Sequence, residues 1–178
     1  MSTNSILSEV KQTGIELIET IAAFTDEDLN RVPFKGSWTA GQVAEHLLKS
    51  ESGLPLILRG TSRPTEGSPD ENVEEIRNTF LDFKTKMQSP EIILPTAGTK
   101  NKEKLVCALE ANRRLILELA STTDLTRTFT TYPFPGIGML TGREWLCFLV
   151  CHTIRHIRQM KNIYSIVRAS REVDSPAT

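Results

Sequence analysis

The sequence is poor in the residues that mark several specialised classes of protein. It has three cysteines, ten glycines, nine prolines and 6% aromatic residues in 178 positions. The glycine and proline content is too low for a collagen-like or low-complexity chain. Cys107, Cys147 and Cys151 follow no disulfide-framework spacing. We therefore expect reduced thiols and a cytoplasmic location.

The chain also has no excess charge of one sign and no long apolar run. Lys and Arg number 21 against 22 Asp and Glu, for a formal net charge of -1. A nucleic-acid partner is disfavoured, because such proteins need a basic face to displace counterions from phosphates. No segment approaches the roughly 20 apolar residues that cross a bilayer, and the first residues do not read as a signal peptide. We expect no membrane partner.

What the chain does have is helical periodicity. Apolar residues recur every three or four positions over about 5–24, 40–58, 101–120 and 142–167, and over a shorter stretch at 73–87. Capping boxes at Thr39–Gln42 and Thr141–Glu144 mark two helix starts. The segments 59–70 and 122–140 read as loops, with room for a brief extended piece at 128–131.

This pattern predicts an all-α protein, a four-helix bundle with a crossover connection and an additional short helix. The 39% of apolar residues can form one sizeable core. We therefore assign residues 1–168 to one bundle domain. Residues 169–178 are polar and read as a fraying C-terminal tail.

The histidines fall in two places, and each place faces the predicted core. His152 and His156 stand four residues apart on the apolar stripe of the last helix, and His46 lies on the stripe of the second helix. A buried imidazole without a partner costs on the order of 1–3 kcal/mol. One shared divalent ion would satisfy all three rings, provided that the two helices run roughly parallel or cross at that level. The alternative is three separate histidines bonded to backbone.

Two sharper metal motifs are missing. Thr153 stands where a zincin motif has its glutamate, and the chain has no Glu-x-x-His pair of the kind found in carboxylate-bridged di-iron bundles. Three histidines without a fourth protein ligand leave a coordination position open, which is typical of catalytic metal sites. Zinc, nickel, iron and copper all accept such a ligand set.

Several neighbouring side chains have two interpretations each. Glu45 is a solvated group or supports the ligand beside it, and Gln159 orients His156 or simply packs. Trp38 and Trp145 fill the core or wall the site. Other candidates are placed by the same reasoning: Tyr132 and Phe134 as a roof or an ordinary loop, Arg155 and Arg158 on a solvated face or with a carboxylate partner, and Cys147 and Cys151 as small buried residues rather than a second metal site.

These motifs resemble those of the DinB-like proteins. The stretch Ser37 to His46, with its Trp-Thr helix start and inward histidine, and the His-x-x-x-His-x-x-Gln motif from His152 to Gln159 are similar to that family's. The family includes YfiT-type metal-dependent hydrolases and thiol S-transferases that use bacillithiol or mycothiol. The resemblance covers essentially the whole chain. It implies a four-helix bundle, nickel or zinc on His46, His152 and His156, and frequently a homodimer, but not DNA binding.

Two classes of function remain open at this point. The first is a metal-dependent enzyme that acts on a small molecule, as a thiol S-transferase with a low-molecular-weight thiol or as a hydrolase. The second is a non-catalytic, stress-related helical module for binding or dimerisation. A cavity over the three rings favours the first, and a loop that plugs the site favours the second.

Overall fold

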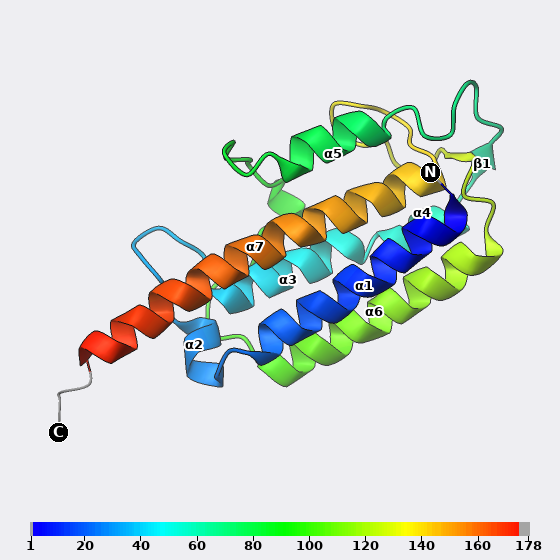
Figure 1. Cartoon of the computed structure of the whole chain (residues 1–178). Helices are drawn as coiled ribbons and strands as arrows, with labels where there is room; N and C mark the ends of the chain where they lie inside the picture. The colour runs from blue at the N-terminus through cyan, green and yellow to red at the C-terminus, as the bar shows by residue number, and fades with distance from the viewer. Residues whose placement is uncertain (1, 175–178) are drawn as a thin grey trace.

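The computed structural model describes residues 2–174 and shows the predicted helical bundle (Figure 1). Its main helices are α1 (Thr3–Ala22), α3 (Ala40–Glu51), α6 (Lys102–Thr122) and α7 (Gly142–Asp174). Helices α1 and α3 each contact both α6 and α7, so the four surround one core. Short helices lie between them: α2 (Asp26–Asn30), α4 (Leu54–Arg59), α5 (Val73–Leu81) and the 3-10 turn η1 (Glu91–Ile93).

Contacts at the two ends of the bundle fix the helix directions. Arg143 at the start of α7 donates to Thr3 at the start of α1, whereas Arg171 near the end of α7 pairs with Glu27 just after α1. Helices α1 and α7 therefore run parallel. Helices α3 and α6 both begin at the α2 end, where Asn30 binds Lys100, and they run the opposite way (Figure 1). The long crossover between α3 and α6 carries α5, which packs on α7.

Both predicted capping boxes are present. Thr39 Oγ1 accepts from Gln42 N and Gln42 Oε1 accepts from Thr39 N, which fixes the start of α3. Glu144 N donates to Thr141 Oγ1 at 3.2 Å, while Glu144 Oε2 accepts from Thr141 N at 2.8 Å. Local hydrogen bonds that the sequence encodes therefore set where the two ligand-bearing helices begin.

Three helix ends differ from the sequence prediction. The expected helix 40–58 is broken after Glu51 and resumes as α4, where Pro55 stands in the first turn. The expected helix 73–87 ends at Leu81, because Arg155 donates to the carbonyls of Phe80 and Asp82 and caps it. Helix α7 continues past the expected end at residue 167 to Asp174, so only residues 175–178 of the expected tail lie outside the described residues.

The loops contain one small antiparallel pair. Strand β1 (Ser62–Arg63) lies within the segment expected to be a loop, and β2 (Thr128–Phe129) lies within the predicted extended piece at 128–131. Ser62 pairs with Phe129 and Arg63 with Thr128. The ladder ties the two long connections together near the start of α7.

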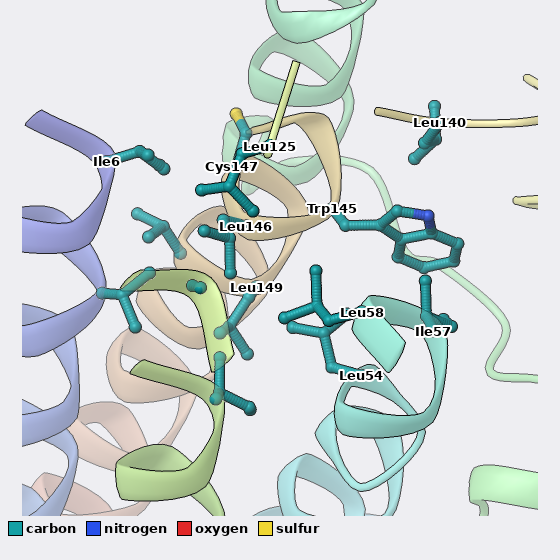
Figure 2. Packing of buried hydrophobic residues seen from close by; sticks show 14 of the residues in the cluster. Ile6, Leu54, Ile57, Leu58, Leu125, Leu140, Trp145, Leu146, Cys147 and Leu149 are labelled. Atoms are coloured by element: carbon teal, nitrogen blue, oxygen red, sulfur yellow. The ribbon is translucent and has the colours of Figure 1, made fainter. Parts of the chain in front are cut away.

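The core consists of two apolar clusters separated by a polar layer. One cluster gathers α4, α5 and the first turns of α1 and α7; Figure 2 shows Ile6, Leu54, Leu58, Trp145 and Leu149 turned toward its centre. The other gathers α2, α3 and the later turns of α1 and α7. Between the clusters, the helices contribute buried polar residues: Thr13, His46, Glu51, Arg113, His152, Thr153 and His156.

Candidate metal centre

The structure brings the three histidines together inside the bundle. His152 Nε2 lies 3.2 Å from His46 Nε2 and 3.0 Å from His156 Nε2. The ligand atoms of all three rings lie within 4.8 Å of one another. The expected parallel or crossing arrangement of the two helices is wrong, because α3 and α7 run antiparallel and meet at the polar layer.

The nitrogen spacing fits a single divalent ion. Metal–nitrogen bonds of about 2.0–2.1 Å place neighbouring ligands about 2.9 Å apart at right angles and about 3.4 Å apart at tetrahedral angles. The two Nε2 separations of 3.0 and 3.2 Å lie within that interval. A proton on His152 Nε2 can satisfy only one of its two neighbours, whereas one cation satisfies all three lone pairs.

The second nitrogen of each ring faces a different partner. His46 Nδ1 donates to the Ile93 carbonyl at 2.9 Å, and His156 Nδ1 donates to Gln159 Oε1 at 2.7 Å. His152 Nδ1 lies 3.4 Å from Ser50 Oγ. Because a carbonyl oxygen only accepts, the ring proton of neutral His46 sits on Nδ1 and leaves Nε2 as a free ligand atom.

Burial keeps the three rings neutral. Burial lowers the pKa of His46 below its ordinary value, and the nearby Lys49 adds to this. Burial, followed by the charges of His156 and His46, holds the pKa of His152 well below its ordinary range. Burial and His46 lower the pKa of His156 to about 3. Neutral imidazole is the form that binds a metal, so the rings are ready as ligands at pH 7.

Aromatic side chains enclose two sides of the site. Phe148 stacks on His152 with ring centroids 5.1 Å apart, and Phe80 meets the same ring edge-on. Trp38, which is half-buried, lies 5.1 Å from the His46 ring, so it is a wall of the site, whereas Trp145 is core. Phe134 packs on Phe148 and thus connects the 132–138 loop to the site. Tyr132, the other roof candidate, is 54% exposed.

The remaining predicted side chains take other roles. Arg155 donates to backbone carbonyls at the end of α5 and has neither of the two roles considered for it. Arg158 is exposed and lies over the Phe83 ring. Cys147 and Cys151 are fully buried with their sulfurs 4.0 Å apart, as expected for small core residues, and Cys107 is exposed.

The sequence reasoning missed a buried ion pair beside the site. Arg113 Nε donates to Glu51 Oε2 at 2.5 Å, and Arg113 Nη2 donates to Thr153 Oγ1. Burial raises the pKa of Glu51, and the charge of Arg113 opposes this. The pair joins α3, α6 and α7 next to the ligands Ser50 and His152 precede and follow in contact. An arginine on the apolar stripe of the third long helix, at Arg113, was the available signal.

The positions of Ser50 and Ile93 as partners of ligand rings were also missed. Ser50 lies one turn after His46 on the same helix face, a spacing that could have identified it. Ile93 contributes only a backbone carbonyl, and it comes from a crossover 47 residues further along the chain. Side-chain patterns carry no signal for such a contact.

Comparison with known proteins agrees with this geometry. The family model described as the DinB superfamily matches residues 9–160. The chain belongs to the DinB superfamily. Within it, the YuaE protein of Bacillus subtilis (strain 168), which is uncharacterised, is 28% identical over 165 residues, covering 88% of this chain and 96% of YuaE.

Two solved structures show that the bundle fold is shared. The four-helix bundle protein TT2238 superposes with a TM-score of 0.60 at 18% identity, covering 90% of this chain and 99% of TT2238. YfiT from Bacillus subtilis superposes with a TM-score of 0.58 at 17% identity, covering 92% of this chain and 87% of YfiT. YfiT is described as a probable metal-dependent hydrolase with an unusual four-helix bundle topology.

Membrane insertion finds no support in the helices. Among residues 2–174, none of the helices combines the length and apolar character needed to span a bilayer.

Proposed function

We propose that this DinB-superfamily protein binds one divalent metal ion, nickel or zinc, through His46, His152 and His156 and uses it in an enzymatic reaction on a small molecule. The observation that carries the proposal is the opposite orientation of the two nitrogens of each ring. The Nε2 atoms converge within bonding distance of one ion, while Nδ1 of His46 and His156 is held by another group. The description of YfiT as a probable metal-dependent hydrolase supports it.

A bound divalent ion with an open position would lower the pKa of a coordinated thiol or water and supply it as a nucleophile. The chain's own contribution is to orient and enclose. Ile93 and Gln159 fix ring orientation, and Phe148 and Trp38 limit the access of water to two of the rings.

Between the two reactions, the surroundings favour thiol transfer over hydrolysis. Neither nearby carboxylate is placed as a general base: Glu45 binds Thr96 and Lys100, and Glu51 is buried with Arg113. A thiol needs less help than water to lose its proton, because its ordinary pKa is about 8.5. In the proposed reaction the thiol proton passes to solvent, a carbon–sulfur bond forms, and the leaving group departs from the electrophilic carbon.

Metal content is the first test. We expect protein purified without an affinity tag or chelator to hold close to one nickel or zinc ion per chain by elemental analysis. His152→Ala should lose that ion, while Arg158→Ala, an exposed neighbour on the same helix, should keep it. Wild-type protein that stays metal-free and does not bind added nickel or zinc would contradict the proposal.

The reaction class is tested on the metal-loaded protein. A cobalt-substituted sample should change its visible absorption when a low-molecular-weight thiol is added, because sulfur would enter the open position. Turnover of an aryl halide with that thiol would then support transfer, and turnover of an ester without a thiol would support hydrolysis. The non-catalytic alternative predicts bound metal with no spectral response to thiol and no turnover. The contact of Phe134 with Phe148, which partly covers the site, is the observation that favours that alternative.

A further inference from the structure

Residues 91–100 form an extended segment, the strap, which runs from η1 to the start of α6 and lies against α3. Apart from the single turn of η1, the strap has no helix or strand to hold it. Its position therefore depends on bonds to side chains.

Glu45 provides the central attachment of the strap. Its carboxylate accepts from Thr96 N at 2.9 Å and from Thr96 Oγ1 at 2.9 Å. Lys100 Nζ, from the far end of the strap, reaches the same carboxylate at 2.7 Å. The Lys100 side chain is only 9% exposed, so this ion pair is shielded from solvent.

Two further side chains of α3 hold the strap on either side of Glu45. Gln42 Nε2 donates to the Thr96 carbonyl at 3.3 Å, and Lys49 Nζ donates to the Leu94 carbonyl at 2.7 Å. Positions 42, 45 and 49 are spaced by three and four residues, so they lie on one face of α3. This face grips the backbone of the strap along its length.

The strap also carries the carbonyl that orients a ligand. Ile93 O accepts from His46 Nδ1 at 2.9 Å, and Ile93 lies between η1 and the Leu94 and Thr96 anchors. We propose that Glu45 is a positioning residue for the metal centre: it fixes the strap, the strap places the Ile93 carbonyl, and that carbonyl keeps His46 Nε2 directed at the ion. This inference rests on the metal binding in the proposed function.

Three substitutions separate positioning through the strap from a simple charge effect. Glu45→Gln removes a negative charge, Lys100→Met removes a positive charge and keeps the aliphatic stem, and Thr96→Val removes the hydroxyl without changing charge. If the strap transmits the effect, all three weaken metal binding, whereas a charge effect alone would weaken it in the first, strengthen it in the second and leave the third unchanged. Glu91→Gln, an exposed carboxylate in the same segment, is the matched control.

We expect each of the three variants to bind zinc about tenfold more weakly than wild type in chelator competition, near the lower end of what groups behind metal ligands contribute. The visible spectrum of the cobalt-loaded variants should also change, which a merely structural role would not cause. Glu91→Gln should match wild type in both. Stronger binding in Lys100→Met, or wild-type affinity in Thr96→Val, would overturn the proposal.

A metal-free measurement keeps this test separate from that of the proposed function. In chelator-treated wild type, nitrogen NMR should find the His46 proton on Nδ1, and amide exchange at Thr96 should be slow. Glu45→Gln should shift that proton toward Nε2 and speed exchange at Thr96. An unchanged His46 tautomer in Glu45→Gln refutes the positioning role even if the protein binds metal, whereas failure of wild type to bind metal refutes the proposed function.

Discussion

At the scale of single residues, the partner of Nδ1 decides what each histidine can do. His46 and His156 each donate this proton, one to a backbone carbonyl and one to a side-chain amide. His152 lacks an obligatory acceptor there, because Ser50 Oγ can either donate or accept. The three rings should therefore differ in how strongly their surroundings fix them.

Gln159 tests this idea directly. Gln159→Leu removes the acceptor of His156 Nδ1 and keeps a side chain of similar size. We expect metal affinity to fall about tenfold to hundredfold, the usual cost of losing a group behind a ligand, with the helix intact. Isothermal titration with zinc measures the affinity, and circular dichroism checks the fold. An unchanged affinity would assign Gln159 to packing alone.

The depressed pKa of His156 makes metal-free stability depend on pH. The folded ring resists protonation down to a pKa of about 3, whereas the unfolded ring takes a proton below its ordinary value of 6.5. Between these values the unfolded state binds more protons, so stability falls as pH falls. From pH 7 to pH 5, chelator-treated wild type should lose about 2 kcal/mol more than His156→Gln in urea unfolding. Parallel pH curves for the two proteins would contradict this.

At the scale of elements, local sequence determined the starts of helices better than their ends. The capping boxes of α3 and α7 could be read from Thr39, Gln42, Thr141 and Glu144 alone. The end of α5 could not, because it depends on Arg155, which lies more than 70 residues away along the chain. The break after α3 was signalled by Gly53 and Pro55, but their effect on the helix was underestimated.

Two glycines in helices should respond in opposite ways to alanine. A Cβ at Gly14 in α1 meets nothing within 4 Å, whereas a Cβ at Gly142 lies 2.7 Å from Leu125 Cδ2 and 2.9 Å from Leu125 Cα. Gly14→Ala should stabilise the protein by about 0.5–1 kcal/mol by reducing the freedom of the unfolded chain. Gly142→Ala should destabilise it by about 1–3 kcal/mol through overpacking. Thermal unfolding of both variants tests the contrast.

The buried pair between α3 and α6 should behave as a unit. Arg113→Met leaves the Glu51 carboxylate buried without its cation, and we expect a loss of about 3–5 kcal/mol. Glu51→Leu combined with Arg113→Met removes both charges and should recover most of that loss. Urea unfolding of the single and double variants gives the coupling. A double variant as unstable as Arg113→Met would show that the two residues act separately.

At the scale of the whole molecule, periodicity predicted the bundle and the meeting of the three histidines, but not the helix directions. The apolar stripes placed His46, His152 and His156 in the core, and the four-helix architecture followed from the same stripes. The antiparallel relation of α3 and α7 depends on how the crossover runs, and its path is set by contacts such as Asn30 with Lys100. The homodimer expected from the resemblance stays a prediction, which light scattering of the purified protein tests.

Bound metal should stabilise the entire bundle. The ligands come from α3 and α7, so an ion that binds only the folded chain raises the free energy of unfolding by about 2.7 kcal/mol at a hundredfold excess over its dissociation constant. Nickel or zinc should therefore raise the melting temperature of chelator-treated wild type. His46→Ala should show no such rise, and calcium, which prefers oxygen ligands, should have no effect on either protein.

The wide separation of the ligands along the chain has a consequence for biosynthesis. His46 and His152 are 106 residues apart, and α7 supplies two of the three rings. A polypeptide still emerging from the ribosome would expose His46 long before its partners are translated. Loading of the ion is therefore a late event, and the cellular supply of nickel or zinc would act on the mature fold rather than guide its first steps of assembly.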